Sequence, residues 1–555
     1  MFNNANNTVD VPPSTCLRDL RPPVTIFKPS MWGHTFASFS LDHQVQETYE
    51  KTIEAIKKKV RSILMAKTSG KPILILVDTL VRLGLAYHFE TEIEEKLEQI
   101  YKEDEEFDLF TTALRFRLLR QHRHQVSCSV FDKFTNKDNK LEESLIGNDV
   151  EGLLSLYEAA HVRIRGEDIL EEAVPFTKHH LTRHMLSLES PLKDKVKRAL
   201  VHSLHRGVPI IEARVYISIY EKDDSRDEII LKLAKLNFNY LQNMYKEELS
   251  ELYRWWNNFD LKSKLPYARD RWIECYMWGV AFHFEPQYSY VRNAVAKAMQ
   301  MVSILDDTYD NYATLNEAQL FTDVLERWDM NEIGQLPDYM KVVYQFIMSV
   351  SEVYEREATQ QGKSFAIPSY KEAVKQLARA YNIEQSWIME RKMPPLEEYL
   401  KNSVITSCVF VMFTAHFPGM KSVTQETIDW LLSNPKIVVS TAMIGRHIED
   451  LGSHERENRE GKYLTVVDCY IKHYGISKEE VLSMFEVLVE DAWKDISKEW
   501  ANKTEGSIPK EIVEQLVNYA RVAEVTYRNS DDGYTDPEKN LGPHIVALFV
   551  DPIVI

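Results

Sequence analysis

Cysteine is scarce and scattered in this sequence of 555 residues. The five cysteines are odd in number, lie far apart and include no Cys-x-x-Cys pair. This usage excludes a disulfide framework and a zinc ribbon, and it fits a reducing compartment. The cysteines are Cys16, Cys128, Cys275, Cys408 and Cys469.

Long apolar runs and an excess of positive charge are missing as well. No apolar run approaches the ~20 residues that a membrane helix needs, and the N-terminal MFNNANNTVD resembles neither a signal peptide nor a transit peptide. We therefore expect a cytoplasmic protein without a membrane span. The net charge of −17 argues against nucleic acid as a partner. An anionic small molecule remains possible if local cations or metal ions hold it.

Glycine and proline, with 18 and 21 residues, stand mostly between segments of helical periodicity. Residues 45–64 and 227–249 repeat apolar side chains at i, i+3, i+4 and i+7, which is the pattern of amphipathic helices. No sustained period-two alternation and no alternation of strands with helices is visible. The sequence therefore predicts an all-α fold.

Two segments mark the organisation of the chain. Residues 1–30 show little periodicity and are predicted to form an extended arm. The charge-dense stretch EKDDSRDE, residues 221–228, separates two periodic segments and has the composition of a solvated turn. We therefore expect an N-terminal helical domain at residues 31–228 and a C-terminal helical domain at residues 229–555.

Two carboxylates extend an apolar stripe in VRNAVAKAMQMVSILDDTYD, residues 291–310. Continuing the stripe by fours leads to Asp306 and Asp310, which would point the same way about one turn apart. Buried carboxylates are costly unless they are paired or bind metal, and Mg²⁺ prefers oxygen ligands. An exposed acidic helix end is the alternative. The stripe consists of Val291, Val295, Ala298 and Val302.

The chain contains an internal control for this motif. Asp223-Asp224-Ser225-Arg226-Asp227 has the same DDxxD spelling, but no apolar run precedes it and Lys222 and Arg226 offset its charge. We assign this copy to the surface, with Asp227 as a cap of the following helix.

A second row of oxygen-bearing side chains lies downstream. Glu449, Ser453 and Glu457 recur at intervals of four and would share one helix face. Two carboxylates and a hydroxyl are hard ligands that suit Mg²⁺, although glutamate-rich helices are more often simply solvated. Arg446 lies one turn before Glu449 and is placed to bind an anion.

A pair of arginines precedes the first acidic row. Arg269 and Arg271 are usually interpreted as surface charges, but beside a metal cluster they could clamp phosphate oxygens. Two acidic rows and these arginines could together hold a diphosphate and make it a good leaving group.

The motifs of the chain resemble those of plant terpene synthases, most closely the sesquiterpene-forming group. The resemblance covers nearly the whole chain. It rests on Arg21-Pro22, PSMWG at residues 29–33, FRLLRQH at 116–122, RWW at 254–256, ARDRWIECYMWG at 268–279, FEPQYS at 284–289, LDDTYDNYAT at 305–314, DAWKDI at 491–496 and DDGYT at 531–535.

The resemblance implies an enzyme with two helical domains. The C-terminal one would be a class I terpene synthase bundle around a central apolar pocket. The N-terminal one would be barrel-like, similar to a class II cyclase domain but without the DxDD acid. The implied reaction is Mg²⁺-dependent ionisation of farnesyl diphosphate, followed by cyclisation of the carbocation to a sesquiterpene hydrocarbon or alcohol. Three Mg²⁺ ions are implied, with Mn²⁺ as a substitute.

The resemblance also assigns roles to individual residues. Asp306 and Asp310 would bind Mg²⁺ on one side of the mouth, and Glu449, Ser453 and Glu457 on the other. Arg269, Arg271 and Arg446 would bind the diphosphate. One position departs from the family pattern, because Glu449 stands where the family has Asn or Asp. Either Glu449 or the adjacent Asp450 could then be the ligand.

A carbocation needs a dry aromatic pocket, since aromatic faces stabilise positive charge without capturing it. By resemblance, Trp278 and Tyr527 line this pocket, although core packing is the default role of any single aromatic residue. Asp532 belongs to the 531–535 segment, which resembles a lid that excludes water. Thr406 and Ser407 resemble a helix break in the pocket wall.

Several alternatives stay open. A monoterpene synthase using geranyl diphosphate would usually carry tandem arginines, but Arg18 and Arg21 are separated. An inactive helical relative would keep the fold alone. A chain-elongating prenyltransferase would carry two DDxxD motifs facing one cavity, and a haloacid-dehalogenase-type phosphatase would need Asp rather than Thr308.

Two minor expectations complete the picture. His179, His180 and His184 have zinc-like spacing but no evident third ligand, so we expect an ordinary surface helix. The oligomeric state is expected to be monomeric.

Overall fold

The computed structural model describes residues 19–67, 70–103, 105–459, 464–502 and 508–555. Within these ranges the chain is helical, and it forms no β-strand beyond an isolated bridge between Thr135 and Leu141. The expected all-α fold is confirmed. The four cysteines within the described residues are all free.

The first part of the chain forms short and medium helices, of which α5 to α9 surround two small cores of their own, whereas α2 to α4 and α10 contribute to the main core. These helices are α2 (His43–Ala66), α3 (Lys71–Arg82), α4 (Glu90–Lys102), α5 (Leu109–Gln121), α6 (Glu143–Ile146), α7 (Val150–Ala160), α8 (Asp168–His184), α9 (Leu192–Val201) and α10 (Pro209–Tyr220). Helix α8 exposes His179 and buries His180 against Phe176.

The second part of the chain consists of longer helices. These are α11 (Glu228–Phe259), α12 (Leu261–Lys264), α13 (Trp272–Phe282), α14 (Ser289–Asn311), α15 (Leu315–Arg327), α16 (Asp338–Gln360), α17 (Ile367–Met389), α18 (Leu396–Thr406), α19 (Val409–His416), α20 (Gln425–Leu432), α21 (Lys436–Arg459), α22 (Val466–Tyr474), α23 (Lys478–Trp500), α24 (Lys510–Thr526) and α25 (Leu541–Phe549). Short 3-10 helices occur at Ala86–His88, Cys128–Phe134, Pro286–Tyr288, Met330–Gln335, Ser364–Ala366, Phe417–Gly419 and Arg528–Ser530.

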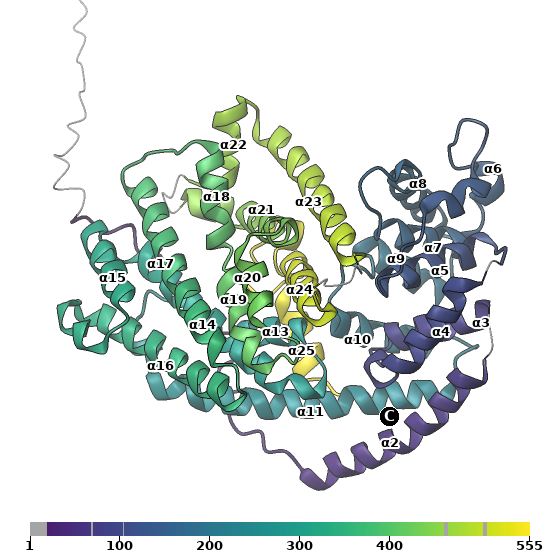
Figure 1. Cartoon of the computed structure of the whole chain (residues 1–555), viewed down its shortest axis with the longest axis horizontal. Helices are drawn as coiled ribbons and strands as arrows, with labels where there is room; N and C mark the ends of the chain where they lie inside the picture. The colour runs from purple at the N-terminus through teal and green to yellow at the C-terminus, as the bar shows by residue number, and fades with distance from the viewer. Residues whose placement is uncertain (1–18, 68–69, 104, 460–463, 503–507) are drawn as a thin grey trace, which may run out of the picture.

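Helix α11 connects the two parts of the molecule. It runs along the base of the structure from the N-terminal helices to the C-terminal bundle, and α2 packs alongside it (Figure 1). The helix begins where the charged turn ends, and the Asp227 carboxylate caps it by accepting hydrogen bonds from the amides of Ile229 and Ile230. The predicted capping role of Asp227 is therefore confirmed.

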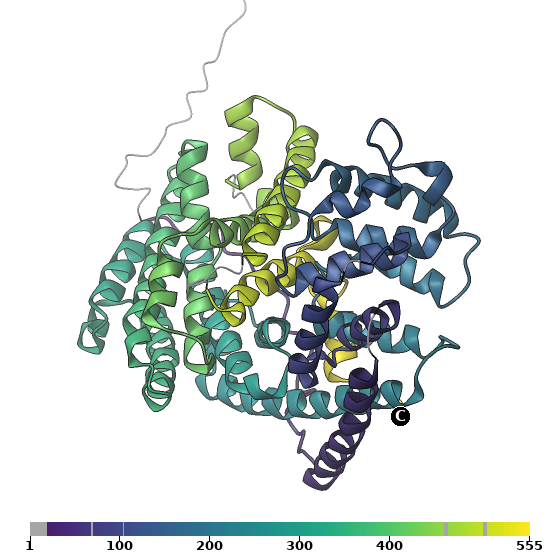
Figure 2. The ribbon, with the colours of Figure 1, turned by 45° about the vertical axis from the view of Figure 1, so that its right-hand side comes forward.

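The C-terminal helices surround α13, whose residues are all buried. Helix α13 packs against α14 and α24, while α21 packs against α23 and α24 (Figures 1 and 2). The main apolar core runs from α2 through α11 into this bundle. The last helix, α25, returns to pack on α10, α11 and α13, so that both parts of the chain share one core.

One helical segment, Leu396–Gly419, is long and apolar enough to cross a membrane by length and composition. In its most apolar 18-residue window, 72% is buried inside the bundle, as expected of a core helix in a large protein. The segment is also interrupted, because Cys408 adopts a left-handed backbone conformation (φ 65°) between α18 and α19. Its composition is therefore explained by the packing of the core.

Candidate active site

The first acidic row lies at the C-terminal end of α14, where the apolar stripe of this helix reaches the surface of the bundle. Val291, Val295, Ala298 and Val302 are buried, and the next two positions, Asp306 and Asp310, line a polar cavity. The apolar stripe anchors the helix in the core. The two carboxylates are thereby held at the cavity wall, as the spacing predicted.

The middle aspartate of this motif has a different environment. Asp307 is fully buried and accepts hydrogen bonds from the Arg269 amide (2.7 Å), the Arg269 Nε (3.2 Å) and the Asn311 side chain (3.1 Å). Arg269 in turn donates from Nη2 to Asp306 Oδ2 at 2.6 Å. Asp307 therefore orients Arg269 toward the cavity. The sequence analysis did not assign this role, because Asp307 lies off the apolar stripe.

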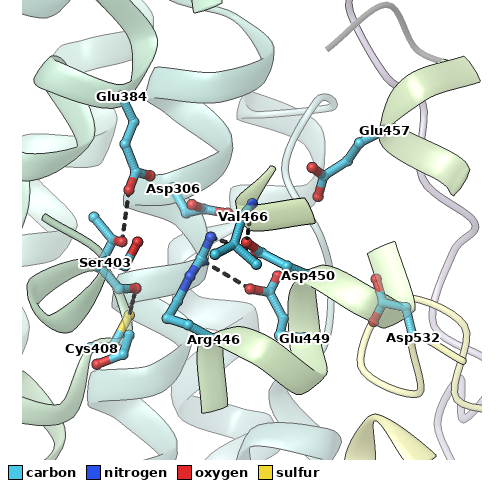
Figure 3. A network of polar contacts seen from close by, with 12 residues as sticks. Asp306, Glu384, Ser403, Cys408, Arg446, Glu449, Asp450, Glu457, Val466 and Asp532 are labelled. Atoms are coloured by element: carbon cyan, nitrogen blue, oxygen red, sulfur yellow. Dashed lines mark hydrogen bonds and ion pairs between the residues drawn. The ribbon is translucent and has the colours of Figure 1, made fainter. Parts of the chain in front are cut away.

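The second row lies on α21, on another wall of the same cavity. Arg446, Glu449 and Glu457 line it, and Figure 3 shows Glu449 and Glu457 on α21 with Asp306 nearby. Arg446 pairs with Glu449 through Nη1 (2.8 Å) and with Asp450 through Nη2 (2.6 Å). Burial raises the pKa of Glu449 well above its usual range, although Arg446 opposes this effect.

The two candidate ligands at the start of this row differ in their surroundings. The Asp450 carboxylate accepts hydrogen bonds from the Val466 amide (2.8 Å) and the Tyr399 hydroxyl (3.3 Å), so it is committed to α18 and α22. Asp450 does not line the cavity, whereas Glu449 does. The geometry therefore favours Glu449 as the ligand.

The oxygen atoms of this site suit a hard divalent cation. Ser453 lies between Glu449 and Glu457 on α21 but lines neither cavity in this conformation; its hydroxyl is fully buried and has no hydrogen-bond partner among the described residues, which a metal ligand would explain. Among the described residues, no three carboxylate, histidine or cysteine side chains converge closely enough to form a metal cluster by themselves. Metal ions at this cavity would therefore need further oxygens from substrate or water, as Mg²⁺ usually does.

Replacing Ser453 with alanine tests this interpretation. We expect S453A to fold normally, because the lost hydroxyl donates no hydrogen bond to the protein, and to need about tenfold more Mg²⁺ for half-maximal activity. Titration of activity with MgCl₂ measures the shift. An unchanged Mg²⁺ requirement would remove Ser453 from the ligand set.

Arg271 is placed differently from Arg269. Its buried guanidinium donates to the backbone carbonyls of Tyr534 (3.1 Å), Thr535 (2.7 Å) and Lys28 (3.2 Å), and it does not line the cavity. The expectation that Arg271 binds a diphosphate is therefore corrected. Its donors are directed at carbonyl groups, and it joins the N-terminal arm to the 531–535 segment.

Two chain segments approach the mouth of the cavity. Phe27 of the N-terminal arm lines it, and the Arg269 guanidinium lies over the Phe27 ring at 5.2 Å. In the 531–535 segment, burial would raise the pKa of Asp532, but Arg456 (2.9 Å) and the Thr535 amide hold it below its ordinary value. Asp532 therefore organises this segment.

An apolar, aromatic cavity adjoins the polar one. Four residues, Arg269, Asp306, Arg446 and Glu449, line both cavities, so the polar region forms the mouth of the apolar one. The apolar cavity together with the solvent space at its opening contains about 700 Å³ free of protein atoms. Its other lining residues are Trp278, Met299, Val302, Ser303, Tyr381, Thr406, Ser407, Cys408, Met412, Gly445, Tyr519, Tyr527 and Tyr534.

The structure thus brings the predicted pocket residues Trp278, Tyr527, Thr406 and Ser407 to one cavity. Sequence analysis missed Tyr381 and Tyr519, because nothing in the local pattern distinguishes them from core aromatics, and it placed Tyr534 only within the 531–535 segment. The one sequence signal for Tyr519 is indirect. Gly445 on α21 faces it so closely that a Cβ there would lie 2.8 Å from the Tyr519 hydroxyl.

The second DDxxD copy lies on the surface outside both cavities. Asp223 pairs with Lys195 at 3.0 Å and accepts a hydrogen bond from the Ser225 hydroxyl at 2.6 Å. This copy does not line either cavity, as predicted from its missing apolar lead-in.

Comparison with known proteins matches this architecture. Residues 257–495 match the terpene synthase family, metal binding domain, and residues 31–200 match the terpene synthase N-terminal domain. The chain belongs to the terpene synthase family. The family resemblance drawn from the motifs is confirmed, and the metal-binding domain indicates dependence on a divalent metal.

Among curated proteins, this terpene synthase is 57% identical to gamma-cadinene synthase from Ocimum basilicum, over 97% of this chain and 99% of the relative. It is 55% identical to tau-cadinol synthase from Lavandula angustifolia, over 97% and 98% of the two chains.

Among solved structures, limonene synthase with 2-fluorolinalyl diphosphate superimposes with a TM-score of 0.90 at 31% identity, over 96% of this terpene synthase and 100% of that chain. Isoprene synthase from grey poplar, in complex with three Mg²⁺ ions and dimethylallyl-S-thiolodiphosphate, gives a TM-score of 0.84 at 33% identity, over 91% and 98%.

Proposed function

We propose that this terpene synthase ionises farnesyl diphosphate and converts the carbocation into a cyclic sesquiterpene, with release of diphosphate. The observation that carries the proposal is the joining of two cavities, one polar and lined by carboxylates and arginines, the other lined largely by aromatic and apolar residues. The assignment as a sesquiterpene synthase agrees with the cadinene- and cadinol-forming relatives, and it is favoured over the geranyl diphosphate alternative.

The two acidic rows are proposed to hold Mg²⁺ on opposite sides of the mouth. Asp306 and Asp310 would bind from α14, and Glu449, Ser453 and Glu457 would bind from α21. When bound, Mg²⁺ neutralises charge on the diphosphate and makes it a better leaving group. We propose three ions, the number in the isoprene synthase complex, with Mn²⁺ as a possible substitute.

Arg269 and Arg446 are the proposed ligands of the diphosphate oxygens. Both guanidinium groups line the mouth, and each is already paired with carboxylates that would turn toward the metal ions. Charge-assisted hydrogen bonds from arginine to phosphate are strong and directional. The diphosphate would thereby be fixed at the polar end, with the isoprenoid chain extending into the aromatic cavity.

The aromatic wall is proposed to stabilise the cation and to exclude water. Trp278 packs edge-on against Tyr519 at 5.7 Å between ring centroids, and Tyr381 and Tyr527 line the same space. A cation over such faces gains about 2 kcal/mol or more once water is excluded. Asp532 and its segment would close the mouth. We further propose that the protein acts as a cytoplasmic monomer.

Incubation of the purified protein with farnesyl diphosphate tests the proposal. We expect C15 products in the organic overlay with Mg²⁺ and none with EDTA, measured by gas chromatography and mass spectrometry. Geranyl diphosphate, supplied in parallel, should give a lower rate of product formation. Products formed from geranyl diphosphate but not from farnesyl diphosphate would overturn the sesquiterpene assignment. The absence of products from both substrates would indicate an inactive relative.

A further inference from the structure

Helix α17 carries a carboxylate that the proposed chemistry does not use. Glu384 is half-buried and lines the polar mouth between α17 and α18. It belongs to neither acidic row and matches none of the motifs that identify the site. Burial raises the pKa of Glu384 to about 7, while Arg446 and two hydrogen bonds oppose this shift. A carboxyl group in such a place needs a structural or functional reason.

Both hydrogen bonds of Glu384 within the described residues come from the last turns of α18. Its Oε1 accepts hydrogen bonds from the Thr406 hydroxyl at 2.8 Å and from the Asn402 side chain at 3.1 Å. Both partners are buried, and Asn402 also donates to the Ala380 carbonyl of α17 at 3.1 Å. The carboxyl group therefore ties α17 to the end of α18.

The end of α18 is the helix break in the wall of the aromatic cavity. Ser407 and Cys408 follow Thr406, and Cys408 has a positive φ of 65°, which is uncommon for a residue other than glycine. The break is held from other sides as well. Tyr519 donates to the Ser407 carbonyl at 2.6 Å, and the Tyr381 hydroxyl contacts the Cys408 sulfur at 3.3 Å.

The same carboxyl group faces Arg446 across the mouth. Figure 3 shows Arg446 lying between Cys408 on one side and Glu449 and Asp450 on the other, with Glu384 above. Glu384 thus accepts a hydrogen bond from Thr406 in the cavity wall and interacts electrostatically with Arg446. Glu384 thereby links the break to the proposed diphosphate end of the cavity.

On the basis of the proposed function, we propose that Glu384 is a positioning residue, which sets the Thr406–Cys408 break against Arg446 and thereby limits the products that form. The break shapes the surface on which the isoprenoid chain folds, and Arg446 determines where ionisation occurs. A shift of the break relative to Arg446 would change which carbons of the isoprenoid chain come close enough to bond, because reactive geometry is sensitive to displacements of about 1 Å.

Three variants separate this role from a general effect on folding. In E384A, Thr406 and Asn402 lose their acceptor, so we expect turnover of farnesyl diphosphate to fall about tenfold. The share of the main C15 product should also fall, with new minor products. In E384Q, the amide oxygen still accepts both hydrogen bonds but the charge facing Arg446 is lost, so the product ratios should shift clearly less than in E384A. T406V should shift the ratios in the same direction as E384A, since it removes one of the two contacts.

Glu372 provides the matched control, because it lies on the same helix but is exposed and pairs only with Arg379 among the described residues. E372A should leave both turnover and product ratios unchanged. Product ratios are compared among enzymes that share the melting temperature of the wild type. If E384A does not fold, T406V and E384Q decide the question.

The proposal is overturned if E384A and T406V keep the wild-type product ratios, or if E384Q changes them as much as E384A does. Failure of the wild type to convert farnesyl diphosphate would contradict the proposed function instead. The two failures are therefore distinguishable in one set of assays.

Discussion

Replacing Asp306 with asparagine should abolish product formation while leaving the fold intact. Asp306 lines both cavities, and its side chain is 26% exposed, so its loss leaves no empty core. Asparagine keeps the size of the side chain but removes the charge that a metal ligand supplies. We expect turnover of farnesyl diphosphate with Mg²⁺ to fall by about 10²- to 10³-fold, the range seen when one electrostatic contact to a reacting group is removed.

The second DDxxD copy, at residues 223–227, provides the control for this prediction. D223N changes the first aspartate of the other DDxxD copy, which pairs with Lys195 away from the cavities. This variant should keep wild-type turnover, and both variants should show the far-UV circular dichroism and melting temperature of the wild type. Full activity in D306N, or a large loss in D223N, would mean that the wrong aspartate cluster was assigned.

Replacing Asp450 should lower the stability of the protein, whereas replacing the adjacent Glu449 should weaken its binding of Mg²⁺. In D450A, the buried partner of Arg446, Tyr399 and the Val466 amide is lost. Arg446 keeps its pair with Glu449, but the buried Tyr399 hydroxyl and Val466 amide lose their acceptor, and a buried polar group left without its partner typically costs about 1–3 kcal/mol. We therefore expect D450A to unfold at clearly lower urea concentration than the wild type.

E449Q should leave stability nearly unchanged and weaken Mg²⁺ binding. Its side chain is 28% exposed at the cavity wall, and Arg446 keeps its bond to Asp450, so stability should change little. The concentration of Mg²⁺ for half-maximal activity should rise by about tenfold or more. If instead D450A keeps its stability but loses Mg²⁺ affinity, Asp450 is the ligand and Glu449 is not.

The contrast between the two DDxxD copies shows how far sequence reasoning reaches. The letters are the same, but the four apolar residues ahead of Asp306 bury one face of α14, whereas Asp223 follows no such stripe. Periodicity alone therefore predicted which copy faces a cavity. It also predicted the shared face of Glu449 and Glu457, because both lie on one uninterrupted helix.

Arginines were harder to place by the same reasoning. Arg269 and Arg271 are two residues apart and looked equivalent, yet one lines the mouth and the other binds backbone carbonyls. They lie just before α13, in a turn without a repeating geometry. Sequence spacing carries no information on side-chain direction in such a turn, so the distinction needed the positions of Asp307 and the 534–535 backbone.

The sequence by itself determined the all-α class, the acidic row on α14, the helix face on α21 and the membership in the terpene synthase family. These depend on local periodicity and on contiguous motifs. Only the tertiary structure decided that Arg271 is structural, that Asp450 turns away from the cavity, and that Glu384 meets the helix break. Each of these depends on partners distant in sequence, whose approach is set by the packing of the whole bundle.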